Sequence, residues 1–310
     1  MKYSNEDLGV FILTYNRPRL LEQTLLSFVH QTIKGFKLTV IDNGSTDREM
    51  KQMKKKIINW GYNYMRLRKN LNPSLILEPI KPKMKTKLFM LFHDDDLIHP
   101  DYLRQAINLF NRYPETIFIG SAMSFDSQPE KLSWPNFTGE FEVFDTVNDF
   151  AAFIYKGFPL HFASVVYVTR YFKEACNPFD VYGKIADRPF LFDMAGNKKR
   201  EIIVLTECYI RYRTHYNQDS QNVNTGPFKD QLFALHRRYR ELLGDNILTA
   251  NGRIFVRKNY EYLYLEALKL KKTTSPEEYI IEALEKGATT RLAINYGRLH
   301  LYLKRLLGYG

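Results

Sequence analysis

Three short apolar runs, each ended by a cluster of polar residues, constrain the fold of this chain more than any other feature. The runs cover residues 8–14, 36–41 and 88–92, and the polar clusters cover residues 14–17, 42–47 and 93–96. Leu21, Leu25 and Phe28 follow the first run at helical spacing, and a capping box of Thr46 and Glu49 after the second run predicts a basic helix to about Asn59. Strands that alternate with helices predict a parallel sheet covered on both faces. Ligands bind at the carboxyl ends of the strands in such sheets, so we expect the three clusters to meet at one site.

The third cluster contains Asp94, Asp95 and Asp96. Carboxylates this close raise one another's pKa or attract a cation, because two unit charges about 4 Å apart interact by roughly 4 kcal/mol at an effective dielectric near 20. Oxygen ligands favour Mg2+ or Mn2+, which keep positions open for water and substrate phosphates. A solvated acidic turn before the next helix would explain the same residues, since negative charge is favourable at a helix N-terminus. The carboxylates alone leave both interpretations open.

The composition predicts a packed globular protein with anionic partners. Of its 310 residues, 45% are hydrophobic and 15% aromatic, and the formal net charge is +11. From residue 228 onward, 15 Lys or Arg stand against 9 Asp or Glu, so +6 of the +11 lies in the last quarter. This charge favours nucleotide phosphates, nucleic acid or an anionic membrane surface as partners. We do not expect nucleic acid as a partner, because the sequence contains no recognised nucleic-acid-binding module.

The cysteines and the N-terminus point to a reducing compartment. Cys176 and Cys208 are the two cysteines, and they lack the spacing of metal ligands or of a disulfide framework. Residues 1–7 are polar and do not resemble a signal peptide, and no apolar run approaches the roughly 18 residues of a membrane span. We therefore expect a cytoplasmic protein, with peripheral attachment to the inner face of the membrane as an option.

Residues 10–17, 40–47 and 91–100 resemble, in their order and spacing, three successive signatures of the inverting family 2 glycosyltransferases. The resemblance implies the GT-A fold, an α/β, Rossmann-like architecture with a mixed, mostly parallel sheet flanked by helices. It also implies a metal-dependent enzyme that transfers a sugar from a nucleoside-diphosphate sugar, most commonly a UDP-sugar among relatives, with Mn2+ or Mg2+ as cofactor.

The resemblance also predicts the domain organisation. Residues 1–222 would form the catalytic domain, in which residues 1–120 bind the nucleotide sugar and residues 121–222 bind the acceptor. Residues 223–310 would form a helical C-terminal region. Its last segment mixes basic and apolar residues, so it either packs on the protein, mediates oligomerisation or lies on an anionic bilayer.

By the same likeness, the first two clusters hold the nucleoside and the third is the DxD motif that holds the metal on the diphosphate. Asp96 is the first choice as metal ligand and Asp94 the second. Asp42, taken alone, would more often form an Asx turn or a helix cap. The residues expected to contact the nucleotide are Thr14, Tyr15, Asn16, Arg17, Asp42, Asn43, Arg68, Asn70, Asp94, Asp95 and Arg213.

A further metal ligand or diphosphate contact is expected after the last strand, which the sequence predicts over residues 202–205. Many family members carry a Tyr-Arg-x-His element on a loop there, and His215 lies at the corresponding position, with Arg213 just before it. Neutral imidazole can ligate a metal and arginine can clamp phosphate oxygens. A plain surface loop would explain the same residues.

The general base implied by the resemblance is Asp187, at the start of a helix expected over residues 189–196. Family members often place Glu before this acid, whereas here Ala186 takes that position. An N-cap would also explain Asp187, because its carboxylate accepts backbone N–H groups well. Asp193 and Asp180 are the alternative bases.

The acceptor implied by the resemblance is a hydroxyl of a glycan or of a lipid-linked saccharide, as in bacterial surface polysaccharide synthesis. Residues 123–147 are expected to be irregular and to face the acceptor, and His161, before a strand expected over 162–168, is either an acceptor contact or a structural residue. Two alternatives remain. A sugar nucleotidyltransferase would usually begin with a Gly-rich phosphate loop, which residues 8–17 lack, and a non-catalytic nucleotide-sugar or glycan-binding protein could share the fold.

Overall fold

The computed structural model describes residues 2–72, 75–126, 133–176, 178–196, 200–214 and 225–244, together with individual helical residues between 281 and 306. The chain divides into two compact units. The first contains residues 1–146, 159–176 and 193–215, and the second contains residues 147–158, 177–192 and 216–310. The domain boundary near residue 222 stays a prediction. Two segments that we expected in the acceptor-binding half, 147–158 and 177–192, belong to the second unit.

The first unit is built on a mixed nine-stranded sheet with the order β3-β2-β1-β4-β8-β6-β9-β5, in which β7 also pairs with β9. Strands β3, β2, β1 and β4 are parallel neighbours, and β8 is antiparallel to β4. The strands are β1 Leu8–Thr14, β2 Lys37–Asp42, β3 Asn63–Arg66, β4 Leu88–His93, β5 Leu97–Ile98, β6 Thr116–Asp126, β7 Phe141–Phe144, β8 Val166–Val168 and β9 Glu201–Arg213. This architecture confirms the predicted GT-A class of fold.

The register of the parallel strands brings the polar clusters together. Thr14 pairs with Asp42 across β1 and β2, and Leu13 pairs with His93 across β1 and β4. Strands β1 and β4 lie in the middle of the sheet, where both faces are covered, and nearly all their side chains are buried. Their apolar sequences therefore end together at one edge of the sheet, and the polar residues that follow share that edge.

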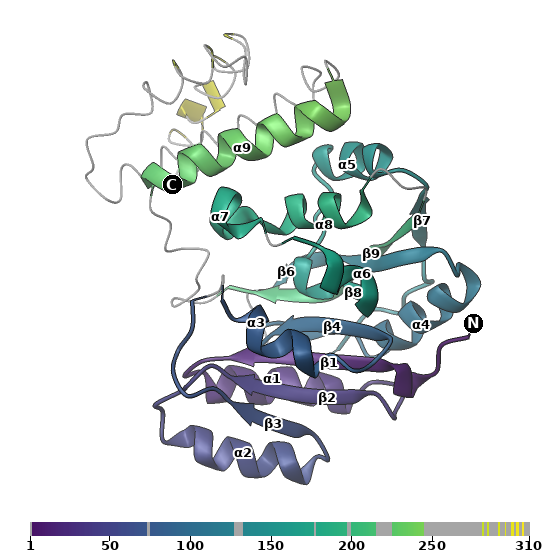
Figure 1. Cartoon of the computed structure of the whole chain (residues 1–310), viewed down its shortest axis with the longest axis vertical. Helices are drawn as coiled ribbons and strands as arrows, with labels where there is room; N and C mark the ends of the chain where they lie inside the picture. Colours follow the sequence, from purple (N-terminus) through teal and green to yellow (C-terminus); the bar gives the residue numbers. More distant parts are fainter. Residues whose placement is uncertain are drawn as a thin grey trace. The chain divides into compact units, whose positions relative to one another are not determined.

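Helices α1 (Pro18–Val29) and α2 (Glu49–Asn59) flank the β1-β2-β3 part of the sheet, as Figure 1 shows. Helix α1 begins at Pro18, whose missing N–H is not needed in a first helical turn. It buries Leu21, Leu25 and Phe28 in the core. The other helices of this unit are α3 Leu77–Ile80, α4 Tyr102–Arg112 and α6 Thr169–Glu174, and the 3-10 turns are η1 Asn5–Asp7, η2 Lys81–Lys83 and η3 Phe162–Ser164.

The second unit is helical. It contains α5 (Val147–Tyr155), α7 (Phe179–Tyr182), the 3-10 turn η4 (Gly183–Ile185), the first part of α8 (Asp187–Ala195) and α9 (Thr225–Leu243). Tyr239 on α9 is buried, with its ring centroid 4.8 Å from that of Tyr155 and 5.3 Å from that of Phe192. These aromatic contacts hold α5, α8 and α9 together.

Three sequence-based expectations about strands were wrong. Residues 162–168 do not form one strand, because η3 occupies Phe162–Ser164 and leaves β8 with three residues. Residues 123–147 are less irregular than expected, since β6 extends to Asp126 and β7 covers Phe141–Phe144. The last strand continues beyond Leu205 to Arg213, because its second half pairs with β5 and with the end of β6.

Candidate functional site

The acidic run lies directly after β4, at the carboxyl edge of the parallel strands. Asp94, Asp95 and Asp96 are all buried. Helix α4 begins only at Tyr102, with Asp101 as its N-cap residue. The run is therefore neither a solvated turn nor the cap of that helix, which removes the alternative interpretation left open by the sequence.

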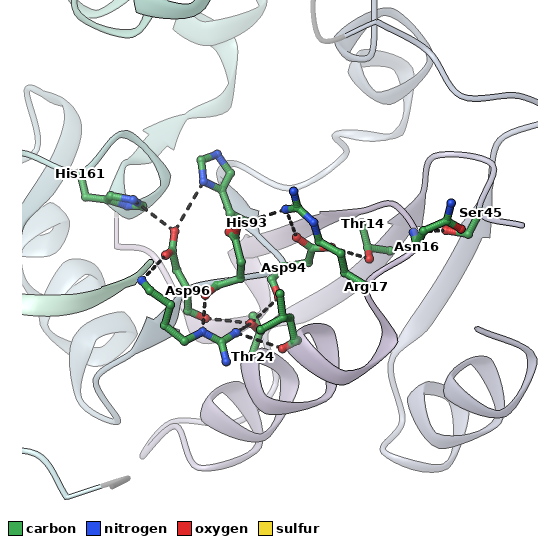
Figure 2. Close-up of polar contacts among 12 residues, drawn as sticks. Thr14, Asn16, Arg17, Thr24, Ser45, His93, Asp94, Asp96 and His161 are labelled. Atoms are coloured by element: carbon green, nitrogen blue, oxygen red, sulfur yellow. Dashed lines mark hydrogen bonds and ion pairs between the residues drawn. The ribbon is translucent and has the colours of Figure 1, made fainter. Parts of the chain in front are cut away.

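The carboxylates of Asp94 and Asp95 form ion pairs with the guanidinium of Arg17. Nη1 of Arg17 lies 3.4 Å from Oδ1 of Asp94 and 3.0 Å from Oδ2 of Asp95. Thr14 donates its hydroxyl to Oδ2 of Asp94 at 2.6 Å. Burial, and then the neighbouring charge of Asp95, raises the pKa of Asp94 to about 6 despite these contacts. The structure thus joins three of the predicted nucleotide contacts and the second-choice metal ligand in one network (Figure 2).

Asp96 faces two histidines, as Figure 2 shows. Its Oδ2 lies 3.2 Å from Nε2 of His161 and 3.5 Å from Nδ1 of His93. Its Oδ1 accepts the backbone N–H of Arg213 at 3.2 Å. Burial alone would raise the pKa of Asp96, but hydrogen bonds from His161 and His93 hold this pKa well below its usual range. One carboxylate oxygen and two imidazole nitrogens therefore converge on a single point.

These three side chains fit a divalent metal. Each offers one ligand atom, and the three atoms lie within 4.8 Å of one another. Apart from the two imidazole contacts, Oδ2 of Asp96 has no hydrogen-bond partner in the described part of the chain although it is fully buried. Carboxylate oxygens suit both Mg2+ and Mn2+, whereas imidazole nitrogens are more typical ligands of first-row transition metals, so the mixed donor set favours a first-row metal over Mg2+. Two imidazole nitrogens and one buried carboxylate oxygen with no further partner among the described residues form a donor set that fits a divalent metal.

Sequence reasoning did not identify His93 and His161 as ligand candidates. His93 carried a local signal, because it is the last residue of β4 and directly precedes the acidic run. The sequence around His161 carried no such signal. His161 reaches Asp96 because its backbone N–H is bonded to Ser121 on β6 at 3.2 Å and the following strand β8 pairs with β4. The predicted ligand His215 lies outside the described residues.

Arg213 has a different place from the one we expected. It lies in β9 and is almost fully buried. Its guanidinium donates to the backbone carbonyls of Leu20 and Asp95 and to the side chains of Gln23 and Thr24. These acceptors belong to α1 and to the acidic run, so Arg213 fastens the run to the helix. This contact pattern gives Arg213 a positioning role, and its contact with a phosphate stays a prediction.

Thr24 is a second residue that holds the acidic run in place. Its Oγ1 lies 2.8 Å from the backbone carbonyl oxygens of both Asp94 and Asp96. Because this hydroxyl also accepts from Arg213 at 2.9 Å, it links the run, α1 and β9 at one point. Fixed backbone geometry of this kind keeps side-chain ligands in position without their own rearrangement.

Asp42 lies at the end of β2, beside a cavity. Its Oδ1 accepts the backbone N–H of Ser45 at 2.7 Å, which is the local turn that a lone Asp was expected to form, and its Oδ2 accepts the hydroxyl of Tyr64. Burial, and then this hydrogen bond to Asp42, raises the pKa of Tyr64 well above its usual value. The cavity has a volume of about 450 Å³ and is lined by Asp42, Ser45, Thr46, Asp47, Arg48, Met50, Lys51, Lys54, Tyr64 and Arg66.

Asn16 connects the first two polar clusters. Its side-chain Oδ1 accepts the backbone N–H groups of Thr46 and Asp47 at 2.8 and 3.0 Å. Its backbone has a φ of 52°, in the left-handed region that asparagine tolerates better than most residues. Asn16 therefore shapes the edge of the site through protein contacts, and its contact with a nucleotide stays a prediction.

Asn43 and Asn70 join the loops that follow β2 and β3. Nδ2 of Asn43 donates to Oδ1 of Asn70 at 2.7 Å, and Oδ1 of Asn43 accepts the backbone N–H of Leu71 at 2.9 Å. Gly44 makes this approach possible, because it has a φ of +78° and a Cβ there would lie 2.6 Å from the carbonyl carbon of Lys69. Tyr15 and Arg68 are exposed in the same region, and their nucleotide contacts stay predictions.

Asp187 is the first residue of α8, as expected, and its side chain is exposed. It belongs to the second unit, whereas the acidic run and both histidines belong to the first. Asp193 and Asp180 are exposed as well. The assignment of Asp187 as general base stays a prediction.

A mixed, mostly parallel sheet flanked by helices is the architecture of GT-A-type glycosyltransferases. Residues 9–173 match the model of glycosyl transferase family 2, which covers more than half of the chain. The chain belongs to this family, and it is a glycosyltransferase. No curated protein matches the sequence.

Solved structures agree with this fold. TarS 1-349 from S. aureus, in complex with UDP-GlcNAc, is similar with a TM-score of 0.61 and 19% identity over 92% of this chain and 80% of that chain. A longer TarS structure gives a TM-score of 0.60 over 94% of this chain and 50% of that chain. The mannosyltransferase PcManGT from Pyrobaculum calidifontis, in complex with GDP-Man and Mn2+, gives a TM-score of 0.52 and 11% identity over 96% of this chain and 84% of that chain.

Proposed function

We propose that this glycosyltransferase moves a sugar, with inversion, from a nucleoside-diphosphate sugar to a hydroxyl of a glycan or a lipid-linked saccharide, and that it requires a divalent metal. The observation that carries the proposal is the convergence of Asp96, His93 and His161 at the carboxyl edge of parallel strands. The ligands of the similar structures, UDP-GlcNAc in TarS and GDP-Man with Mn2+ in PcManGT, support a donor of this class.

In this proposal Asp96, His93 and His161 hold the metal. A bound divalent cation would act as a Lewis acid on the diphosphate and stabilise its charge as it departs. Arg17, between Asp94 and Asp95, keeps their charges compensated beside the metal and limits the repulsion within the acidic run. Thr24 and Arg213 keep the backbone of the run fixed, so the ligands do not have to reorganise when the donor binds.

The nucleoside is expected at the ends of β1 and β2. Asp42 borders the cavity beside α2, and Tyr64 and Ser45 orient its carboxylate. Tyr15 is exposed at the end of β1, where its ring can stack on a base. A uridine nucleotide is our first choice, in keeping with the TarS complexes.

The acceptor hydroxyl requires a base, and we assign this role to Asp187. Its carboxylate would accept the proton of the hydroxyl as the new glycosidic bond forms, an effect typically worth 10² to 10⁴ in rate. Its position at the first turn of α8 leaves the carboxylate exposed, so a substrate can reach it.

We also propose that the C-terminal segment contacts an anionic membrane surface. Leu299, Tyr302, Leu303 and Leu306 are spaced as one helical face and are between 46% and 65% exposed. The sequence has Arg291, Arg298, Lys304 and Arg305 in this segment and no acidic residue after Glu285. Basic residues with an exposed apolar face are typical of helices that lie on anionic lipid. Within the described residues, the structure has no helix that could span a membrane.

Vesicle sedimentation tests the membrane proposal. The full chain should sediment with vesicles that contain phosphatidylglycerol and should do so less at high salt. Leu303→Asp should reduce this binding, whereas Leu75→Asp, at another exposed leucine in the first unit, should leave it unchanged. Equal sedimentation of both variants, or equal binding to neutral vesicles, would refute the proposal.

The donor proposal is tested by thermal unfolding in the presence of UDP, GDP, CDP or dTDP, each with and without Mn2+. We expect UDP to raise the unfolding temperature only when Mn2+ is present, because ligands that bind the folded state stabilise it. The matching UDP-sugars should then be consumed by slow transfer to water. The proposal would be contradicted if none of the nucleotides raised the unfolding temperature, or if UDP raised it equally with and without Mn2+.

A further inference from the structure

Two aromatic side chains lie side by side at the ends of β6 and β9. Phe125 pairs with Tyr212 in the parallel register of these strands. Their ring centroids are 5.6 Å apart with an interplanar angle of 77°, an edge-to-face arrangement. Phe125 is 68% exposed, more than any other large apolar side chain described in this structure. The pair therefore presents an aromatic surface to solvent, and we call it the Phe125–Tyr212 pair.

The pair is connected to the metal-ligand candidates. The centroid of Tyr212 lies 5.4 Å from that of His161, and the ring of His161 lies 5.7 Å from that of His93. Nε2 of His161 in turn contacts Oδ2 of Asp96 at 3.2 Å. A continuous row of rings thus leads from the carboxylate that would hold the metal to an exposed phenyl ring.

A solvent-exposed ring at this place requires an explanation. A single exposed apolar residue is ordinary, but this one continues a row of rings that ends at the candidate metal site. The face of an aromatic ring carries partial negative charge, so it attracts C–H groups that are polarised by neighbouring oxygen atoms. Pyranose rings present such C–H groups on their flat faces, whereas an acceptor recognised by its phosphate would be held by cationic side chains.

We propose that the Phe125–Tyr212 pair is the platform on which a pyranose ring of the acceptor stacks, so that the acceptor is a saccharide. This inference rests on the proposed function, because it names the acceptor of the same transfer. A sugar stacked on Phe125 would lie on the far side of Tyr212 and His161 from Asp96, which would hold the metal. His161 separates the two binding places, with its ring against Tyr212 and its Nε2 against Asp96.

The transfer balances with this arrangement. The acceptor oxygen forms a bond to the anomeric carbon of the donor sugar, and the bond between that carbon and the diphosphate oxygen breaks. The bonding electron pair leaves with the nucleoside diphosphate, and the proton of the acceptor hydroxyl goes to the general base. The platform takes no part in these bond changes and acts on acceptor affinity alone.

The test uses saturation-transfer NMR on the full chain with UDP and diamagnetic Mg2+, because paramagnetic Mn2+ would broaden the signals of a ligand bound nearby. The probes are methyl pyranosides of the gluco, galacto, manno and N-acetylglucosamine configurations, with glycerol 3-phosphate as the competing chemistry. We expect at least one pyranoside to show transfer to its ring C–H protons. Phe125→Ala should reduce this signal at least fivefold, and Phe125→Tyr should retain it. Ile58→Ala, at another exposed apolar residue of the first unit, should leave it unchanged.

The outcomes separate this inference from the proposed function. Thermal stabilisation by UDP with Mn2+ should be the same in the wild type and in Phe125→Ala, because the platform does not touch the donor. If that stabilisation is present but the pyranoside signal survives in Phe125→Ala, or if only glycerol 3-phosphate binds, the platform is refuted and the donor site stands. If the wild type shows no stabilisation by any nucleotide, the proposed function fails and the platform fails with it.

Discussion

Nε2 of His161 lies 3.2 Å from Oδ2 of Asp96, which joins the segment before β8 to the acidic run after β4. The two residues belong to different halves of the sheet, and the antiparallel pairing of β8 with β4 brings them together. Both side chains are buried. A contact of this length between an imidazole nitrogen and a carboxylate oxygen suits a direct hydrogen bond as well as two neighbouring ligands of one metal.

His161→Ala should weaken Mn2+ binding at least tenfold, since it removes one of three ligand atoms. Loss even of groups that only orient ligands costs roughly 10- to 100-fold in metal affinity. Electron paramagnetic resonance of free Mn2+, titrated with protein, measures this directly. His30→Ala, an exposed histidine at the end of α1, is the control and should bind Mn2+ like the wild type. Unchanged affinity in His161→Ala would assign His161 a structural role.

Asp187→Asn should abolish sugar transfer to the acceptor while UDP binding in the presence of Mn2+ stays within about twofold. The amide keeps the shape of the side chain but cannot accept the proton, and loss of a general base typically costs 10² to 10⁴ in rate. Single-turnover transfer and UDP titration together check this prediction. Asp193→Asn, on the same helix, is the comparison. If only Asp193→Asn loses activity, the base must be reassigned to Asp193.

Arg213→Ala should lower the free energy of unfolding by about 3–5 kcal/mol, the cost typical of removing one partner from a buried charged network. The substitution removes the guanidinium hydrogen bonds to the carbonyls of Leu20 and Asp95. Urea denaturation measures the change. Arg19→Ala is the control, because its exposed ion pair with Glu49 should contribute at most about 1 kcal/mol. Equal stability of the two variants would show that Arg213 does not fasten the acidic run.

The pKa of Asp94 predicts a pH dependence of stability without metal. It is raised from 3.8 to about 6 in the folded protein, so the folded state binds a proton more tightly than the unfolded state. This tighter proton binding adds to the free energy of unfolding. Its contribution is complete below about pH 4 and is lost as the pH rises through 6. Asp94→Asn cannot ionise. Its free energy of unfolding should therefore rise by about 3 kcal/mol relative to that of the wild type between pH 4 and pH 7, at 1.36 kcal/mol per pKa unit.

Urea denaturation in EDTA across this pH range checks the prediction. Asp145→Asn, at an exposed site, serves as control and should show no comparable trend. If the free energies of unfolding of Asp94→Asn and the wild type differ by the same amount from pH 4 to pH 7, burial beside Asp95 does not raise the pKa of Asp94.

The strands that carry the site could be predicted from the sequence because their patterns are local. A strand covered on both faces needs an unbroken apolar run, and the runs that became β1 and β4 stop where the polar residues begin. The parallel pairing of such strands then places Thr14, Asp42 and the acidic run at one edge. The family resemblance added the expectation of a metal on Asp96.

The contacts between distant segments could not be predicted in this way. His161 approaches Asp96 only through the pairing of β8, and a lone histidine carries no signal for such a partner. The family resemblance places Arg213 on a loop, yet pairing of its segment with β5 and β6 makes it part of a strand and buries its guanidinium. Tertiary pairing, rather than local preference, decided both positions.

The central claim is that Asp96 holds a metal on which the diphosphate of the donor is bound. Calorimetric titration of UDP into the wild type and into Asp96→Asn, each with and without Mn2+, tests this claim most directly. We predict that the wild type binds UDP at least tenfold more tightly with Mn2+, and that Asp96→Asn, still folded by circular dichroism, loses this gain. Equal gains from Mn2+ in the two proteins would contradict the claim.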